Sequence, residues 1–453
     1  MAARSFVAPR ATSTGTVRLS GTAPLRGSVA TPGSKSLSNR ALICAALSTG
    51  ESTLRGLASG DDTARMVAGL RALGAVIEQE SSEATSVVIR HGVELDDASA
   101  CTLHAGLAGT TSRFLTALAA LRVGRTTIDG DAGLRRRPMG DVIRIVRMVG
   151  ANVEELGEPN CLPVAVSRGA LRLHLDGSTR AALVAQGGVS SQFVSALMMI
   201  APHLGGLVVT LPRDMVSREY LHMTAEVMRA FGALVDVSNE RVQVWAASYA
   251  GTHYHVGGDW SSASYAFAAG AIAGGEVRVA GLHMASAQPE ARFVDVLQSM
   301  GCAVRSDADG VVVSRDSAHP LRGVNVDMGT MSDLVPTLAV IAACAEGPTT
   351  IRGVGYIRAK ESDRIGDLAN ELRVAGAEVH ELPDGLRIVP QALRAGVLDT
   401  HDDHRLAMSL ALLGLCCDGV AVRNPEVVAK SWPDYWQAMA SGLGLQLRDE
   451  PHR

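Results

Sequence analysis

Two kinds of helix alternate along the predicted secondary structure. One kind begins with Ser, Thr or Asp and then stays Ala-rich and apolar on nearly every face, which is typical of a helix buried on all sides. Six segments share this pattern: SKSLSNRALICAALS from position 34, AGTTSRFLTALAAL from 108, SSQFVSALMMIA from 190, SSASYAFAAGAIA from 261, SDLVPTLAVIAACA from 332 and DDHRLAMSLALLGL from 402. The other kind is amphipathic, so we expect it to cover the surface.

A glycine follows each amphipathic helix and precedes an alternating, strand-like stretch. The glycines are Gly74, Gly150, Gly232, Gly301, Gly376 and Gly444, at intervals of 68 to 82 residues. These intervals exceed the period of about 20–50 residues of solenoid repeats, so each repeat is a whole supersecondary unit. We predict six βαβαββ units, in which each glycine ends the surface helix and a strand follows.

The polar residues of the buried helices are concentrated in their first turns. A helix N-terminus carries unpaired N–H groups and about half a positive charge, so it binds anions. If six equivalent helices point the same way, their N-termini converge on one region. We expect that region to hold a small ligand with several negative charges.

Length and composition exclude several classes of protein. At about 100–200 residues per domain, the 453 residues predict two to four domains. The net charge of −4 argues against a nucleic-acid or anionic-membrane partner. No apolar run reaches the ~18–20 residues of a membrane-spanning helix. The first 18 residues lack an amphipathic face typical of a targeting peptide, so we expect a cytoplasmic location.

The first buried helix carries a candidate anion cradle. Lys35, Ser36 and Arg40 follow a Pro-Gly turn, and Ser36 and Arg40 are one helical turn apart. An ordinary capped helix with solvated charges explains the segment equally well on its own. It is not a nucleotide-binding P-loop, because G-x-x-x-x-G-K-[ST] is absent.

The segment PGSKSLSNRALICAALSTG resembles the signature of the 3-phosphoshikimate 1-carboxyvinyltransferase (EPSP synthase) family. Further motifs follow in family order to residue 435, across about nine-tenths of the chain. They are Ala108-Gly109-Thr110 with Arg113, Arg137-Pro138-Met139-Gly140, Ser190-Ser191-Gln192, Val216-Ser217, Gly258-Asp259 to Tyr265, Lys360-Glu361-Ser362-Asp363-Arg364, Asp403-His404-Arg405 and Lys430 to Tyr435.

The resemblance implies transfer of the enolpyruvyl group of phosphoenolpyruvate to the 5-hydroxyl of shikimate 3-phosphate, with release of phosphate. Both substrates carry a phosphate and a carboxylate, which a cluster of Arg and Lys suits. The implied phosphoenolpyruvate-binding residues are Lys35, Gly109, Arg137, Gln192, Arg364, Arg405 and Lys430. The implied shikimate 3-phosphate-binding residues are Lys35, Ser36, Arg40, Ser190, Ser191, Gln192, Ser217, Asp333, Tyr356 and Lys360.

The reaction needs one proton placed on C3 of the enol and one removed from the attacking hydroxyl. The resemblance implies Asp333 as the base and Glu361 as the acid, with Lys35 as a third catalytic residue. Without the family, Asp333 is equally an N-cap and Glu361 a surface ion pair. No cofactor is implied, and no metal is expected, because helix capping explains His401 and His404 better than a metal site.

The resemblance also implies the architecture. We expect an α/β fold of two domains in an inside-out α/β barrel, with three repeats per domain and buried parallel helices. The implied N-terminal domain spans 33–257, the C-terminal domain combines 1–32 with 258–453, and the active site lies in the cleft between them. A monomer is expected.

Four positions depart from the family pattern: Leu107, Phe114, Gly133 and Tyr356. Tyr356 lies where the family contacts the shikimate ring, so an enolpyruvyltransferase of secondary metabolism acting on another cyclic alcohol stays open. The related enzyme that acts on UDP-N-acetylglucosamine is disfavoured, because the loop 130–137 holds no Cys. A polyanion-binding scaffold would need a basic stripe with interleaved aromatic residues, which the sequence lacks.

Overall fold

The chain divides into two compact units. The structure is a computed structural model that describes residues 15–21, 24–80, 83–170, 182–184, 191–213 and 215–450. One unit comprises Gly33–Val256, and the other combines residues 15–32 with 257–450. Ser190 and the N-terminal segment 1–14 lie outside the described residues.

The described residues form three four-stranded sheets in each unit. In the first unit the strand orders are β16 (His253–His255), β4 (Ser52–Arg55), β6 (Val87–His91), β5 (Val76–Gln79); β7 (Cys101–His104), β8 (Thr126–Asp129), β10 (Val164–Ser167), β9 (Asn152–Glu155); and β11 (Ala182–Val184), β12 (Gly206–Thr210), β14 (Arg241–Trp245), β13 (Val235–Val237). A short parallel pair, β15 (Tyr249–Ala250) with β3 (Ser48–Thr49), adds to this unit.

The second unit repeats the same pattern. Its strand orders are β2 (Leu25–Ala30), β17 (Gly275–Ala280), β19 (Gly310–Arg315), β18 (Ala303–Asp307); β20 (Asn325–Asp327), β21 (Thr349–Arg352), β23 (Gly385–Val389), β22 (Glu378–Leu382); and β24 (Gly396–Leu398), β25 (Val420–Arg423), β1 (Thr16–Ser20), β26 (Gln446–Glu450). In all six sheets the first two strands pair in parallel and the others antiparallel. The predicted mixed α/β class is confirmed.

Three strands come from parts of the chain distant from the rest of their repeat. β2 pairs with β17, and β1 lies between β25 and β26, so the N-terminal strands complete two sheets of the second unit. β16, near residue 255, completes the first sheet of the first unit by pairing with β4. The chain therefore passes between the units at residues 32–33 and again at 256–257.

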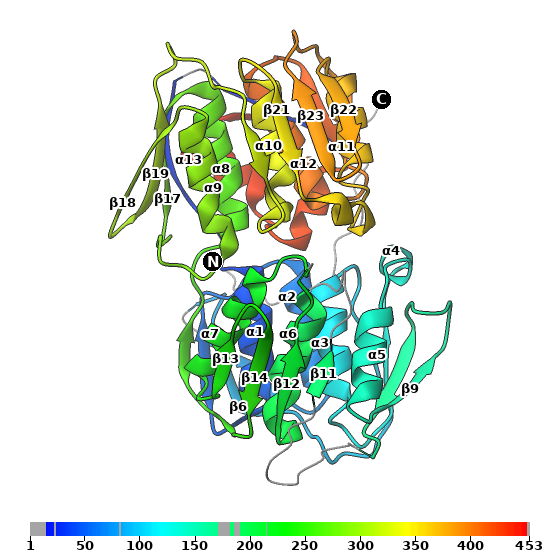
Figure 1. Cartoon of the computed structure of the whole chain (residues 1–453). Helices are drawn as coiled ribbons and strands as arrows, with labels where there is room; N and C mark the ends of the chain where they lie inside the picture. The colour runs from blue at the N-terminus through cyan, green and yellow to red at the C-terminus, as the bar shows by residue number, and fades with distance from the viewer. Residues whose placement is uncertain are drawn as a thin grey trace. The chain divides into compact units, whose positions relative to one another are not determined.

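One helix in each repeat is buried on nearly all sides, as the apolar runs predict. These helices are α1 (Lys35–Ala46), α3 (Gly109–Ala119), α6 (Ser191–Ile200), α8 (Trp260–Ala273), α10 (Val335–Ala343) and α12 (His404–Leu410). Every residue of α8 and of α10 is buried. Figure 1 shows α8 beside the strands β17 and β19 that it contacts.

Hydroxyl groups connect the buried helices of the second unit. Thr337 on α10 hydrogen-bonds Ser264 on α8 at 3.1 Å and Ser409 on α12 at 3.3 Å. Buried hydroxyls need partners, and here each helix supplies the partner of the next. The three helices are thereby fixed in register along one side of the core.

The surface helices end at the predicted glycines. They are α2 (Asp61–Ala72), α5 (Gly140–Met148), α7 (Glu219–Ala230), α9 (Phe293–Ser299), α11 (Gly366–Val374) and α13 (Tyr435–Leu443); the short α4 (Ala132–Arg135) precedes α5. All six glycines have positive φ, between 66° and 105°. In α2 the Gly74 N–H donates to Arg71 O and the Ala75 N–H to Leu70 O, which is a Schellman motif. The predicted helix ends are confirmed.

An arginine in the last turn of four of these helices donates to the strand that follows. Arg71, Arg147, Arg229 and Arg373 each reach the carbonyl six residues ahead, at 2.7–3.2 Å. A cation there also interacts favourably with the helix C-terminus. These bonds fix the angle at which each helix passes into its strand.

No helix of the described residues is long and apolar enough to cross a membrane.

Candidate active site

In the first unit, the predicted site residue Arg40 is almost completely buried. Its Nε donates to Thr224 Oγ1 at 2.8 Å, and its terminal nitrogens donate to Ser36 O and Ser195 Oγ at 2.9 and 3.4 Å. The guanidinium lies 5.3 Å from the centre of the Phe114 ring. Phe114, a departure from the family pattern, is thus a packing surface for this cation.

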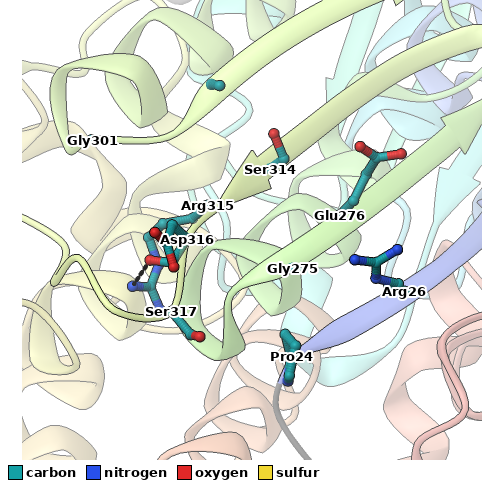
Figure 2. Close-up of a pocket in the computed structure, with 10 residues that line it drawn as sticks. Pro24, Arg26, Gly275, Glu276, Gly301, Ser314, Arg315, Asp316 and Ser317 are labelled. Carbon is teal, nitrogen blue, oxygen red and sulfur yellow. Dashed lines mark hydrogen bonds between the residues drawn. The ribbon is translucent and has the colours of Figure 1, made fainter.

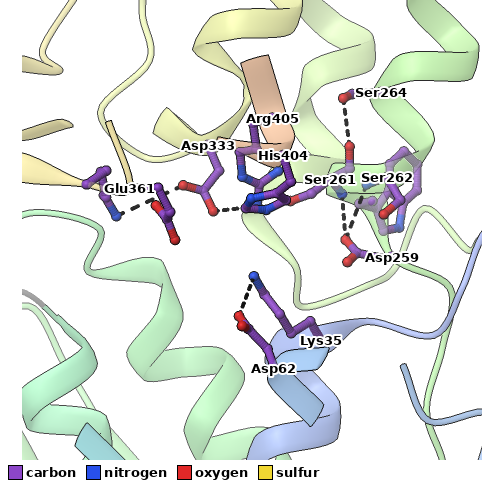
Figure 3. Close-up of polar contacts among 12 residues, drawn as sticks. Lys35, Asp62, Asp259, Ser261, Ser262, Ser264, Asp333, Glu361, His404 and Arg405 are labelled. Carbon is purple, nitrogen blue, oxygen red and sulfur yellow. Dashed lines mark hydrogen bonds and ion pairs between the residues drawn. The ribbon is translucent and has the colours of Figure 1, made fainter. Parts of the chain in front are cut away.

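Lys35 begins α1 and pairs with a carboxylate. Its Nζ lies 3.1 Å from Asp62 Oδ2 on α2, and the two side chains are 15% and 5% exposed (Figure 3). Ser34 caps the same helix by accepting from the Leu37 N–H. The cap therefore comes from Ser34, which leaves the Lys35 and Ser36 side chains outside the capping bond.

Gly109 begins α3 and touches the guanidinium of Arg137. A Cβ built on Gly109 would lie 2.6 Å from one terminal nitrogen of Arg137 and 2.8 Å from its Cζ. The absence of a side chain therefore allows Arg137 to lie against the N-terminus of α3. Leu107, which departs from the family pattern, is 41% exposed. A Cβ on Gly133, another departure, would lie 2.9 Å from Leu107 Cδ2.

Gln192, in the first turn of α6, is held by Arg113. The Arg113 guanidinium donates to Gln192 Oε1 and, at 3.3 Å, to Pro138 O, and it lies 4.9 Å from the Phe193 ring centre. Arginine has no acceptor, so the amide must present its oxygen to Arg113. The NH₂ group of the Gln192 amide then points away from Arg113.

The serines of the first unit have different surroundings. Ser191 begins α6 and is buried, whereas Ser36 is partly exposed. Ser217 has a φ of 55° and lies in the turn that opens α7, where its carbonyl accepts from the Tyr220 N–H. A positive φ on a serine is unusual and places its hydroxyl by a constrained turn.

In the second unit, Arg364 contacts three carboxylates. It donates to Asp403 at 2.6 and 3.1 Å, to Asp333 Oδ1 at 3.0 Å and to Glu361 Oε2 at 2.9 Å. Its side chain is 1% exposed. Burial opposes the charge, but the charges of Asp403, Glu361 and Asp333 outweigh it and raise the pKa of Arg364. The guanidinium is thus a permanent buried cation.

The two proposed catalytic carboxylates also contact other cations. Asp333 accepts from Arg405 at 2.6 Å and lies 4.0 Å from the Lys360 ammonium, and Glu361 lies 3.4 Å from the Lys430 ammonium. Figure 3 shows Asp333 directed toward Arg405. Asp333 is not the N-cap of α10, because that position belongs to Leu334.

Tyr356 closes one side of this cluster. Its hydroxyl donates to Gly329 O at 2.8 Å, and the Lys360 ammonium lies 5.9 Å from the centre of its ring. The aromatic face therefore supports the position of Lys360. A tyrosine in place of the family's usual residue is compatible with an ordered lysine here.

Asp403 connects the cluster to the first turn of α12. Its carboxylate is fully buried, accepts from the Arg405 N–H as an N-cap, and also accepts from Ser362 Oγ at 3.0 Å. The sequence indicated a cap at this helix but not the bond to Arg364. His404 is buried beside it. Among the described residues, no group of three or more His, Cys, Asp or Glu could hold a metal ion.

Three of the residues that organise the site were not predicted to do so: Asp62, Arg113 and Asp403. Each acts on a predicted residue, namely Lys35, Gln192 and Arg364. Arg113 and Asp403 stand inside the motifs, which is the one signal that the sequence offers. The pairing partners depend on tertiary packing.

A separate hollow of about 410 Å³ lies on the second unit, lined by residues that include Arg26, Glu276 and Arg315 (Figure 2). Arg315 donates to Ala271 O and Ile272 O at the C-terminus of α8, at 2.6 and 3.0 Å. Glu276 pairs with Arg305 at 2.8 Å. Arg315 and Glu276 therefore have structural partners, and these two charges do not form a cluster of cations like the one around Asp333 and Glu361.

We predict that Arg364→Met destabilises the second unit strongly, because the buried carboxylate of Asp403 would lose its cation. Breaking a buried pair costs about 3–5 kcal/mol. Urea unfolding followed by circular dichroism measures the loss. The double variant Arg364→Met/Asp403→Leu should regain part of it, since no buried charge is then left unpaired.

Arg278→Met is the matched control, because Arg278 also makes two hydrogen bonds to one carboxylate, at 2.6 and 2.8 Å. That pair is 26% and 39% exposed, so its loss should cost only about 0–1 kcal/mol. Equal destabilisation by the two variants would contradict this account of Arg364.

Comparisons with known proteins agree on one family. The model of the family EPSP synthase (3-phosphoshikimate 1-carboxyvinyltransferase) matches residues 19–439. A 3-phosphoshikimate 1-carboxyvinyltransferase of Methanoculleus marisnigri is 40% identical over 432 residues, 95% of this chain and 99% of that protein. The structure of EPSP synthase from Acinetobacter baumannii has a TM-score of 0.78 at 25% identity, over 97% of this chain and 100% of that one.

The enolpyruvyl transferase NikO from Streptomyces tendae shares the fold, with a TM-score of 0.77 at 19% identity over 98% of this chain and 100% of that chain. The family match covers the buried helices and every motif quoted above, from Lys35 to Tyr435. This chain belongs to the EPSP synthase (3-phosphoshikimate 1-carboxyvinyltransferase) family.

Proposed function

We propose that this protein transfers the enolpyruvyl group of phosphoenolpyruvate to the 5-hydroxyl of shikimate 3-phosphate and releases phosphate. The observation that carries the proposal is the cluster in the second unit. There Arg364, Arg405, Lys360 and Lys430 surround Asp333 and Glu361, within a chain of this family. Four cations suit substrates that each carry a phosphate and a carboxylate.

Asp333 is the proposed base. Nearby cations favour the ionised form of a carboxylate, and Asp333 is in contact with two arginines. The Asp333 carboxylate takes the proton of the 5-hydroxyl as the hydroxyl oxygen attacks C2 of phosphoenolpyruvate. Glu361, which must be protonated for this step, gives its proton to C3 and becomes a carboxylate. The C2–O bond and the C3–H bond form together, and the product of this step is a tetrahedral adduct.

The adduct then loses phosphate. The C2–O bond to the phosphate breaks, a proton leaves C3 to Glu361, and the C2–C3 double bond of the enol ether forms. Lys430 lies 3.4 Å from Glu361 and Lys35 pairs with Asp62, so each ammonium is held by a carboxylate before substrate binds. Lys35 is proposed to stabilise the charge that develops on the departing phosphate.

The remaining residues are proposed to bind substrate. Phosphoenolpyruvate is assigned to Lys35, Gly109, Arg137, Gln192, Arg364, Arg405 and Lys430. Shikimate 3-phosphate is assigned to Lys35, Ser36, Arg40, Ser190, Ser191, Gln192, Ser217, Asp333, Tyr356 and Lys360. No cofactor or metal takes part in this scheme.

Residues of both units are proposed to act on the same substrates, as two domains of an inside-out α/β barrel, 33–257 and 1–32 with 258–453, with the site in the cleft between them. The recurrence of the same four-stranded sheet pattern in both units supports the division into two similar domains. A cytoplasmic monomer without nucleic-acid or membrane partners stays a prediction, and sedimentation velocity would measure the oligomeric state.

The alternative acceptor is another cyclic alcohol. Tyr356 is the one observation that favours it, since a bulky ring stands where the family contacts the shikimate ring. The Tyr356 hydroxyl is engaged by Gly329 O and its face by Lys360. Because Lys360 is itself assigned to shikimate 3-phosphate, this arrangement is compatible with the main proposal.

Release of inorganic phosphate from phosphoenolpyruvate tests the proposal. We expect release that depends on shikimate 3-phosphate, with stoichiometric consumption of both. Release that requires a different cyclic alcohol would support the alternative acceptor, and a lack of release with shikimate 3-phosphate would contradict the main proposal.

We predict that Arg137→Ala in the first unit and Lys430→Ala in the second both raise the KM for phosphoenolpyruvate, with little effect on that for shikimate 3-phosphate. Charge-assisted hydrogen bonds contribute about 1.5–3 kcal/mol, or roughly tenfold to a hundredfold in affinity. Steady-state kinetics with each substrate varied measures this, and Arg278→Ala is the control. If either variant weakens both substrates equally, its assignment to phosphoenolpyruvate is wrong.

We predict that Gly109→Ala is less sensitive than the parent to glyphosate, which competes with phosphoenolpyruvate in this family. The new methyl group would stand 2.6–3.0 Å from the end of the Arg137 side chain and displace it. A longer inhibitor in that space should suffer more than the shorter substrate, whose KM should rise modestly.

Inhibition constants against varied phosphoenolpyruvate measure the difference. Gly396→Ala is the matched control, because a Cβ there meets no atom within 4 Å and the φ of Gly396 is not in the left-handed region. Equal sensitivity of Gly109→Ala and Gly396→Ala would remove Gly109 from the pocket.

A further inference from the structure

The turn before α12 is conformationally strained. His401 and Asp402 have φ values of 50° and 55°, so two successive residues other than glycine adopt the left-handed region. Such a conformation is unfavourable for a residue with a Cβ and persists only where the surroundings fix it. The Asp403 N–H donates to Thr400 O at 2.8 Å and closes the turn. The next residues, Asp403 and Arg405, belong to the candidate site.

Glu371 on α11 holds this turn through both of its carboxylate oxygens. One oxygen accepts from the Asp399 N–H at 2.8 Å, and the other lies 2.9 Å from His401 Nε2. The His401 N–H in turn donates to Asp399 Oδ1 at 2.8 Å. Glu371 is 8% exposed, so its two oxygens are committed to the turn rather than to water.

Two residues in or just before α11 bind the 399–405 segment. Arg364, just before the helix, binds the Asp403 carboxylate, and Glu371, seven residues later, binds Asp399 and His401. Arg364 precedes α11 and Glu371 lies within it, and these contacts place both side chains against the 399–405 segment. Loss of the contact between Glu371 and His401 would let the strained turn relax and would move Asp403 relative to Arg364.

Further charges face the imidazole of His401. Asp367 on α11 lies 3.7 Å from Nδ1, and Asp399 lies on the same loop, where it also pairs with Arg423 of β25 at 3.3 Å. Burial opposes protonation, but the hydrogen bond to Glu371 and the charges of Asp367 and Asp399 outweigh it and raise the pKa of His401.

The neighbouring Asp402 carboxylate is directed to another partner. It accepts from the Asn424 Nδ2 at 2.7 Å. Asn424 begins the segment that leads to Lys430, and its own φ is 49°. The turn is therefore connected on its other side to a second strained position.

We propose that His401 and Glu371 are positioning residues of the phosphoenolpyruvate-binding half-site: their contact holds the strained 399–402 turn, and through it the Asp403–Arg364 pair and Arg405. The proposal deepens the proposed function and rests on it. Neither residue touches substrate in this account.

The sign of the pH dependence follows from the raised pKa. Below the ordinary histidine pKa of about 6.5, His401 is charged in both folded and unfolded chains, and its contact with Glu371 contributes fully. As the pH rises through the higher folded-state pKa, the imidazole loses its charge and the contribution falls. Binding of phosphoenolpyruvate should therefore weaken toward alkaline pH through this residue.

The test variant is His401→Asn. Asparagine tolerates the left-handed region, so the substitution adds little backbone strain, but its side chain is too short to reach Glu371. We expect the KM for phosphoenolpyruvate to rise by about twofold to thirtyfold, as for residues that act through another, with the KM for shikimate 3-phosphate nearly unchanged.

The ratio of kcat/KM for phosphoenolpyruvate between parent and His401→Asn is then measured from pH 6 to 9. Titration of the substrate and of other groups cancels in this ratio. We expect the ratio to be largest at low pH and to fall as His401 deprotonates, because the contact with Glu371 then loses its charge. Glu371→Gln keeps the shape of the side chain but removes its charge. It should raise the KM for phosphoenolpyruvate as His401→Asn does, and its parent-to-variant ratio of kcat/KM should depend on pH in the same way.

His380→Asn is the matched control. His380 lies on β22 of the same unit and pairs with Glu378 at 2.7 Å, but it is 52% exposed and distant in sequence from the site motifs. Its parent-to-variant ratio should stay at one at every pH.

An unchanged KM for phosphoenolpyruvate in both His401→Asn and Glu371→Gln, or a parent-to-variant ratio independent of pH, would overturn the proposal even if both variants melt at lower temperature. A parent that converts neither phosphoenolpyruvate nor shikimate 3-phosphate would instead overturn the proposed function, and this inference with it.

Discussion

The first turn of each buried helix is the constraint on which the rest of the structure depends. A helix buried on all sides needs a partner for every polar group, and the unpaired N–H groups of its first turn always require one. In α1, α8 and α12 the caps are Ser34, Asp259 and Asp403. Several candidate site residues, among them Lys35 and Arg405, lie in these same turns, so capping and the proposed anion binding fall on neighbouring positions.

Several cations of the candidate site contact carboxylates of the protein. Lys35 has Asp62, Arg405 has Asp333, and Lys430 has Glu361. Removing one partner of a buried pair is costly, so an anionic substrate must share the cations rather than replace the carboxylates. The proposed base Asp333 and acid Glu361 are thus held by the same cations that are proposed to bind the substrate. These carboxylates therefore lie next to the proposed substrate-binding groups.

Much of the architecture could be predicted from the sequence. The apolar helices and the glycines at their intervals are local signals, and Gly74 or Gly376 has the positive φ that its place after a helix requires. The family resemblance singled out Asp333, Glu361 and Arg364, which the structure brings into contact. The partners could not be predicted, because Arg364–Asp403 and Arg113–Gln192 join residues 39 and 79 positions apart through packing. The contact of His401 with Glu371 lies outside the motifs and depends on a strained turn that no local pattern indicates.

The fate of C2 of phosphoenolpyruvate tests the central claim most directly. Phosphoenolpyruvate labelled with ¹³C at C2 is incubated with shikimate 3-phosphate and the protein, and the products are followed by NMR. The account predicts that the label appears in an enol ether attached to the 5-oxygen of the acceptor, with one equivalent of inorganic phosphate. Labelled pyruvate with unmodified shikimate 3-phosphate would contradict it, because the cluster around Arg364 would then support hydrolysis rather than transfer.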